Sequence, residues 1–407
     1  MQLLIKNGLV IDPASRRELR ADVLVRGGRV VRVSPRLSAP SAEVYDASGK
    51  WVFPGFIDLH VHAREPGAER SETIASAARA AAAGGVTSVL LMPNTSPPMD
   101  SPARLRRYAA RAERAAVNVY FSAAVTAGRG GVRLGPLAAL RAAGALAFTD
   151  DGACVSDDRL LEAALRECRR LRRPLLDHPE LPGLPGPEAE TFAALRDILA
   201  TRGRYPVHLQ HLSLAASLAA LALGKRCGLP VTGETCPHYF ALTAADARRG
   251  GTDFKMNPPL RAAADRAAVL RALADGTLDA IATDHAPHER RLKARPWELA
   301  PNGVIGLETL APLCVTELVL NRRVTRLRLA ELLSANPARL LGLRRKGALA
   351  PGRDADITVL DPGAARRVPA RFVSLSSNSP FKGRLLRGWA CATVVRGRFV
   401  FRDGKFC

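Results

Sequence analysis

His60 and His62 stand one residue apart at the end of an apolar run, Phe53-Pro-Gly-Phe-Ile-Asp-Leu-His-Val-His62. Side chains alternate across a β-strand, so both imidazoles are predicted to lie on the same face. Neutral imidazole is a common zinc ligand, and two rings on one face can reach one ion. An ordinary His-x-His pair in a strand is the alternative, and further candidate ligands along the chain weaken it.

Four more side chains of metal-ligand type follow predicted strands, namely Asp151, His178, His211 and Asp284. Each has a plain alternative when it is taken alone: Asp151 could belong to a turn, and the histidines could be hydrogen-bonded residues at strand ends. Together with His60 and His62 they suit one or two Zn²⁺ ions, with Asp151 bridging if there are two. Such a centre could activate a water molecule for attack on a carbonyl, with Asp284 accepting the proton and passing it to the leaving nitrogen.

The elements that must position these residues follow a βα pattern, in which apolar runs alternate with helical stretches rich in Ala, Leu and Arg. Eight candidate strands end near His62, Pro93, Thr126, Asp151, His178, His211, Glu234 and Asp284. Eight such units predict an α/β fold, a (β/α)8 TIM-like barrel, with its chemistry at the C-terminal ends of the strands. His208 competes with His211, because strand alternation would point them to opposite faces and let only one face the barrel axis.

The residue pattern at the two ends of the chain differs from the βα pattern of the middle. Residues 1–52 and 345–407 alternate short apolar runs with turns and are predicted to form one small composite β-sandwich domain. Residues 53–344 are then the metal-dependent catalytic barrel.

Composition narrows the class of protein. Hydrophobic residues make up 47% of the chain, which is typical of a globular protein, and no apolar run approaches a membrane span. The seven cysteines are scattered, which favours reduced thiols in the cytoplasm. The formal net charge of +22 invites a nucleic-acid hypothesis, but only 5% of residues are aromatic, and the arginines are spread over helical stretches. We expect no nucleic acid and no membrane, and an acidic partner protein or an anionic substrate instead.

Three polar residues near the predicted strand ends are candidates for substrate binding. Arg64 follows the two histidines and could hold a carboxylate with its guanidinium. Asn94 ends the second strand, and Asn257 lies in a proline-stiffened loop; both amides could bond ring C=O and N–H groups. A surface arginine and two turn residues are the alternatives.

The motifs that carry these residues resemble the class I dihydroorotases of the amidohydrolase superfamily, nearly from end to end. They are Asp58-Leu-His-Val-His-Ala-Arg-Glu-Pro-Gly67, Met92-Pro-Asn-Thr95, Phe148-Thr-Asp-Asp-Gly152, Lys255-Met-Asn-Pro-Pro-Leu-Arg261, Ala282-Thr-Asp-His-Ala-Pro-His288, Asn302-Gly-Val-Ile-Gly-Leu-Glu308 and Asn378-Ser-Pro-Phe-Lys-Gly383. The chain departs from the family at His178-Pro-Glu180, where a His-Cys-Glu-Asp-like sequence is common, and the segment that follows is shorter. A more open barrel mouth is expected there.

The resemblance implies a (β/α)8 barrel and the reversible cyclisation of N-carbamoyl-L-aspartate to L-dihydroorotate in pyrimidine biosynthesis. It also implies metal ligation by the six residues above, an acid–base role for Asp284, and substrate binding by Arg64, Asn94, Asn257 and His288. A homo-oligomer and docking to aspartate carbamoyltransferase are the partner hypotheses.

Two alternative functions stay open on the sequence. One is a hydantoinase-like cyclic amidase; such enzymes usually bridge their metals with a carboxylated lysine, and no lysine occurs near the end of the fourth predicted strand. The other is a non-catalytic, dihydroorotase-like partner of aspartate carbamoyltransferase, against which the complete set of ligand types argues.

Overall fold

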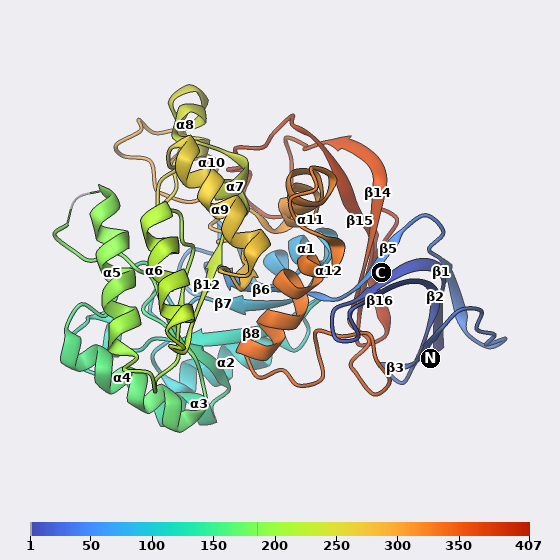
Figure 1. The fold of residues 1–407 in the computed structure, drawn as a ribbon, viewed down its shortest axis with the longest axis horizontal. Helices are drawn as coiled ribbons and strands as arrows, with labels where there is room; N and C mark the ends of the chain where they lie inside the picture. The colour runs from blue at the N-terminus through green and yellow to red at the C-terminus, as the bar shows by residue number, and fades with distance from the viewer. Residues whose placement is uncertain (1, 185) are drawn as a thin grey trace.

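Eight parallel strands form a closed barrel at the centre of the computed structural model, which describes residues 2–184 and 186–407 (Figure 1). In barrel order the strands are β6 (Phe56–Val61), β7 (Val86–Leu91), β8 (Asn118–Ala123), β9 (Ala145–Phe148), β10 (Leu175–Asp177), β11 (Val207–Leu209), β12 (Val231–Thr235) and β13 (Ala280–Ile281). A parallel bridge between Val61 and His285 joins the first strand to the segment after the last and closes the ring. The predicted (β/α)8 fold is confirmed.

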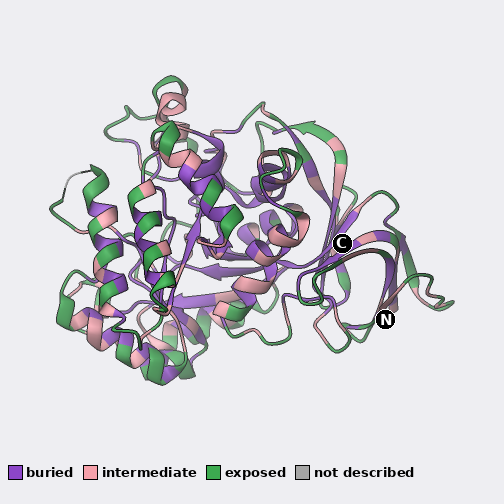
Figure 2. Ribbon diagram, in the orientation of Figure 1, coloured by how far each residue is buried: buried purple, intermediate pink, exposed green. Residues whose placement is uncertain are grey.

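Helices surround the barrel and cover its outer face (Figure 2). Those that follow the strands in turn are α1 (Ile74–Ala83), α2 (Pro102–Ala112), α3 (Leu137–Ala142), α4 (Asp158–Leu171), α5 (Gly186–Ala200), α6 (Ala215–Arg226), α9 (Ala263–Asp275) and α11 (Leu310–Leu313). The other α-helices in the described residues are α7 (Pro237–Ala241), α8 (Ala244–Gly250), α10 (Arg290–Lys293), α12 (Arg326–Ala330) and α13 (Asn336–Leu340). Every residue of β6 and β7 is buried, because side chains fill the barrel on one face and helices cover the other.

Helix α4 shows how the sequence specifies these outer helices. The Asp157 carboxylate accepts a hydrogen bond from the Leu160 N–H and caps the first turn. Leu161, Leu165 and Cys168 lie on its buried face, at the three- and four-residue spacing of an amphipathic helix. Arginines occupy much of the opposite face, so part of the positive charge of the chain is solvent-exposed helix surface.

The two chain ends form one nine-stranded sheet beside the barrel, where both termini lie (Figure 1). Its strand order is β17 (Lys405–Phe406), β16 (Arg398–Arg402), β15 (Leu385–Val395), β14 (Ile357–Arg367), β5 (Trp51–Pro54), β1 (Gln2–Asp12), β2 (Arg17–Arg26) and β3 (Arg29–Ser34), with β4 (Glu43–Asp46) paired to β1.

This terminal sheet curls over a core of its own. The rings of Tyr45 in β4 and Phe399 in β16 lie 5.4 Å apart although their strands are distant in the sheet order. Strand β5 extends the terminal sheet to Pro54, two residues beyond the boundary that the sequence suggested. In the described residues, no helix combines the length and hydropathy needed to cross a membrane.

Candidate metal centre and substrate cavity

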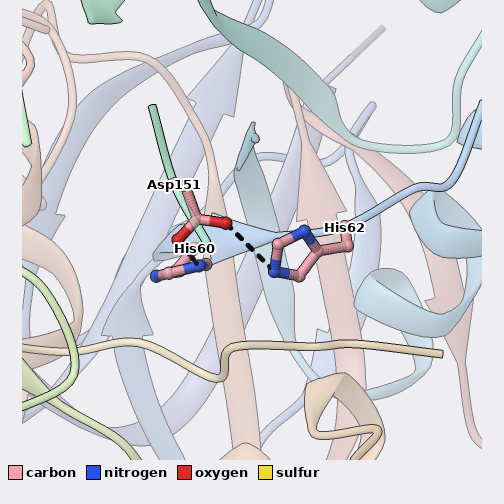
Figure 3. Close-up of side chains that lie close together, drawn as sticks. All are labelled: His60, His62 and Asp151. Carbon is pink, nitrogen blue, oxygen red and sulfur yellow. Dashed lines mark ion pairs between the residues drawn. The ribbon is translucent and has the colours of Figure 1, made fainter. Parts of the chain in front are cut away.

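The candidate ligands from the first, fourth and eighth barrel strands converge at one point. The Nε2 atom of His60 lies 3.1 Å from Oδ1 of Asp151, and the Nε2 atom of His62 lies 3.6 Å from Oδ2 of the same carboxylate (Figure 3). Oδ1 of Asp284 lies 3.0 Å from Nε2 of His62 and 3.5 Å from Nε2 of His60. Four side chains from three segments that are far apart in the sequence therefore direct their ligand atoms at a common space.

A second group shares Asp151 with the first. The Nδ1 atom of His178 lies 3.6 Å from Oδ1 of Asp151 and 2.7 Å from Nε2 of His211. The Asp151 carboxylate stands between the two groups, and all of these side chains are buried.

These residues fit divalent metal ions. Zinc bonds of about 2.0–2.1 Å in a tetrahedral site place neighbouring ligand atoms about 3.3 Å apart. The distances within the first group, 3.0–3.6 Å, bracket that value. In addition, Nε2 of His60 is buried and has no hydrogen-bond partner among the described residues. A buried nitrogen of this kind, directed at two carboxylates, is well placed to bind a cation.

The chain geometry at the strand ends makes this convergence possible. His211 and Asp284 adopt left-handed backbone conformations, with φ of 35° and 46°. This conformation is uncommon for residues other than glycine and clusters at functional sites. Both residues follow the last hydrogen-bonded positions of their strands, β11 and β13.

The prediction that only one of His208 and His211 faces the barrel axis is wrong. His208 in β11 contacts Oε2 of Glu234 at 3.2 Å, inside the barrel, while His211 contacts His178. Strand alternation no longer applies at His211, because β11 ends at Leu209 and the left-handed turn redirects the ring.

A second layer of polar groups orients three of the four rings. Oε1 of Glu234 lies 3.3 Å from Nδ1 of His60, and Oδ1 of Asn94 lies 2.9 Å from Nδ1 of His62. Oε2 of Glu180 lies 2.9 Å from Nε2 of His178. Such partners fix which ring nitrogen is free to bind a metal.

Electrostatics keep the two central carboxyl groups ionised. Burial alone would raise the pKa of Asp284, but the rings of His60 and His62 outweigh it and hold that pKa below its ordinary value. Burial also opposes ionisation of Asp151, and the surrounding histidines again outweigh it and lower its pKa. Two buried, ionised carboxylates beside several imidazole nitrogens form a donor set suited to a divalent cation.

The predicted substrate-binding residues border the same space. A cavity of about 260 Å³ is lined by several of the ligand residues and also by Arg64, Asn94, Asn257, His288, Asn302 and Gly303. Nε of Arg64 donates to the Pro287 carbonyl at 3.2 Å, which places its guanidinium beside the His288 ring. Burial, with a smaller contribution from Arg64, lowers the pKa of His288 to about 3. Arg64 therefore supplies the positive charge at this end of the cavity.

Comparison with known proteins places the chain in a family. The sequence profile of the Amidohydrolase family matches residues 51–400. The chain belongs to the amidohydrolase family.

Individual relatives agree with this assignment. A protein of Pelotomaculum thermopropionicum named dihydroorotase is 43% identical over 424 residues, which cover 99% of this chain and 99% of the relative. A dihydroorotase of Anaeromyxobacter dehalogenans strain 2CP-C is 44% identical over 431 residues, covering 99% and 98%. The fold is similar to that of the L-hydantoinase (dihydropyrimidinase) of Arthrobacter aurescens, with a TM-score of 0.90, 27% identity, and coverage of 100% and 97%. The resemblance to dihydroorotases of the amidohydrolase superfamily is confirmed.

Sequence reasoning gave no role to several residues of this amidohydrolase site: Glu180, Gln210, Glu234, Asn302 and Gly303. Glu234 could have been recognised, because it follows the strand-end rule that identified the ligands. Glu180 could not, because its role depends on a turn that directs its carboxylate back to His178 and to the Asn257 amide, which donates to it at 2.6 Å.

Proposed function

We propose that this amidohydrolase is a dihydroorotase, which interconverts N-carbamoyl-L-aspartate and L-dihydroorotate in pyrimidine biosynthesis. The observation that carries the proposal is end-to-end identity of 43–44% to proteins of that name. The cavity is consistent with it, because the Arg64 guanidinium and the candidate metal ligands line the same cavity. A cyclic amide bearing a carboxylate could span the two.

We propose Zn²⁺ as the metal, held by His60, His62, Asp151, His178, His211 and Asp284, with Asp151 bridging if two ions bind. When bound, zinc would polarise the amide carbonyl as a Lewis acid and make a water molecule more acidic. No lysine occurs between Lys50 and Lys225, so with two ions bound Asp151 would be the bridging carboxylate in place of a carboxylated lysine.

In this proposal Asp284 moves the proton. Its carboxylate is ionised and held 3.0 Å from His62, facing the cavity. In the hydrolytic direction it accepts a proton from the attacking water and delivers it to the departing ring nitrogen. In the biosynthetic direction it removes the proton from the ureido nitrogen as that nitrogen attacks the carboxylate carbon, and it passes the proton to the departing carboxylate oxygen, which leaves as hydroxide.

The remaining cavity residues hold the substrate. Arg64 would pair with its carboxylate, and His288 stands beside that guanidinium as a neutral hydrogen-bonding partner. Asn94 and Asn257 also line the cavity and would bond the ring amides. Such anchoring would favour ring closure by holding the reacting groups in a near-attack geometry.

The test combines metal stoichiometry with turnover of dihydroorotate before and after chelation. We expect bound zinc, turnover of dihydroorotate, loss of turnover on chelation, and recovery on adding zinc back. Activity on hydantoin but not on dihydroorotate would select a hydantoinase-like cyclic amidase instead. A chain without tightly held metal or activity would support the non-catalytic partner of aspartate carbamoyltransferase.

This function would place the protein in the cytoplasm, and the net charge of +22 could serve docking to aspartate carbamoyltransferase. We propose this docking and a homo-oligomeric state together. Size-exclusion chromatography of the chain, alone and mixed with that enzyme, tests both, since an unchanged monomer peak would contradict them.

A further inference from the structure

The loop between β14 and β15, residues 368–384, leaves the terminal sheet and reaches the barrel mouth. Asn378 in this loop is only 3% exposed. Its Nδ2 donates to the carbonyl oxygens of Ala286 and Gly303, each at 3.0 Å. Its Oδ1 accepts from the N–H of His288 at 3.2 Å, and its own carbonyl accepts from the N–H of Ile305 at 2.9 Å.

These four hydrogen bonds join two separate segments, 286–288 and 303–305. The segments also pack tightly against each other: a Cβ on Gly303 would lie 2.8 Å from the Cβ of Ala286 and 3.0 Å from Nε2 of His288. Nε2 of His288 lies 2.7 Å from the Asn302 carbonyl oxygen. The N–H of Ala286 also donates directly to the Val304 carbonyl at 2.8 Å. Asn378, in the loop between β14 and β15, therefore reinforces the register of two cavity-lining segments that already contact each other.

Both segments lie at the end of the cavity that contains the Arg64 guanidinium. Ala286, His288, Asn302 and Gly303 line the cavity. Arg64 is held by the Pro287 carbonyl, which lies between the two residues that Asn378 bonds. The position of the guanidinium thus depends on a segment that Asn378 fixes.

We propose that Asn378 is a positioning residue for the carboxylate of the substrate, acting through Arg64 and His288; this inference rests on the proposed function. Asp284 is anchored separately. The next residue, His285, pairs with His62 through its carbonyl at 2.9 Å and with Glu72 through its ring at 3.2 Å. Loss of Asn378 should therefore weaken substrate binding more than it slows the chemical step.

Asn118 offers a matched control. It is 4% exposed, and its Nδ2 donates to the Thr87 carbonyl at 2.9 Å and to Asp356 at 2.8 Å. Its Oδ1 accepts from Arg396 at 3.0 Å. It is as buried and as fully bonded as Asn378, but it begins β8 at the opposite end of the barrel.

The experiment measures KM and kcat for dihydroorotate, zinc content and thermal unfolding in Asn378→Ala, Asn378→Asp and Asn118→Ala. Loss of these hydrogen bonds should raise KM about tenfold in Asn378→Ala, with kcat within about threefold and zinc content unchanged. Asn378→Asp keeps the acceptor for His288 but places a carboxylate against two carbonyl oxygens, so its KM should rise at least as much. Asn118→Ala should lower the unfolding temperature and leave KM unchanged.

An unchanged KM in both Asn378 variants, loss of zinc, or a fall in kcat alone would overturn the proposal. So would failure of both Asn378 variants to fold while Asn118→Ala folds, because Asn378 would then be purely structural. A wild-type chain without dihydroorotate turnover would instead refute the proposed function. The two failures are therefore distinguishable.

Discussion

The two ends of the barrel both bury charged groups, but they satisfy them differently. At the amino end, Asp356 accepts hydrogen bonds from the Asn118 side chain and the Arg396 backbone, each at 2.8 Å, and also from Lys346. At the carboxyl end, Nε2 of His60 has no hydrogen-bond partner among the described residues, although two carboxylates lie close to it. Protein groups satisfy the amino-end cluster, whereas the carboxyl-end cluster keeps a buried imidazole nitrogen available for a cation.

Left-handed backbone conformations also differ between the amino-end and carboxyl-end clusters of the barrel. Arg396 has a left-handed φ of 50°, but it lies in the tight turn between β15 and β16, where such a conformation is normal. Arg64, His211 and Asp284 have left-handed conformations at the barrel mouth, outside any hairpin turn. Unpaired polar atoms and strained residues together distinguish a functional cluster from a structural one.

The largest effect that this comparison predicts is on Asp284. Asp284→Asn removes the proton acceptor and should lower kcat for dihydroorotate by at least about 1,000-fold, while zinc remains bound in part. Steady-state kinetics and a mass-spectrometric metal count check this together. Near-normal turnover in the variant would refute the role of Asp284 as acid and base.

Asp356 should show the opposite profile. Asp356→Ala leaves the buried Lys346 ammonium without its nearest carboxylate, and loss of one partner of a buried pair costs about 3 kcal/mol of unfolding free energy. We expect a lower denaturation midpoint and unchanged kcat/KM for the fraction that folds. A large loss of specific activity with normal stability would contradict the division between the two ends.

Glu234 tests the difference between the two ends of the barrel. It is as buried as Asp356, but it contacts a candidate metal ligand at the carboxyl end. It bridges His60 and His208, and hydrogen bonds from these rings, opposing burial, lower its pKa to about 2. Glu234→Gln should weaken zinc binding about 10–100-fold by loosening the orientation of the His60 ring. Competition with a chelating dye measures this.

Glu317→Gln, at a partly buried ion pair with Arg384, is the control for Glu234→Gln. It should leave zinc affinity unchanged. Equal zinc affinity in wild type and both variants would show that Glu234 is structural.

The barrel and the candidate site could be predicted from the sequence because both depend on local features. These are the spacing of apolar residues and the residue types that directly follow each apolar run. The apolar runs that became β6 and β7 were legible, and the ligand types stood directly after such runs. Asp151 and Asp284 needed only the rule that strand ends meet at one edge of a barrel.

What the sequence could not predict depends on backbone geometry and long-range contacts. The side of the barrel that His211 faces follows from a left-handed φ, which no residue pattern specified. Asn378 reaches Ala286 and His288 across about 90 residues of chain, so its contacts become visible only when the terminal sheet is docked. The short apolar runs at the chain ends predicted a small β domain, but they did not indicate that a single sheet would curl until Tyr45 meets Phe399.

The smallest effect is expected on the helix surface, which belongs to neither end of the barrel. Arg170 on α4 is exposed and pairs with Glu167 one turn earlier at 2.6 Å, where solvent screens the interaction. Arg170→Gln should therefore change neither the denaturation midpoint nor KM measurably. If instead KM for the anionic substrate rises and the increase disappears at high salt, the surface charge must guide the substrate toward Arg64. The exposed arginines of the helices would then contribute to substrate capture, and the positive charge of the chain would have a function besides keeping the helix surface solvated.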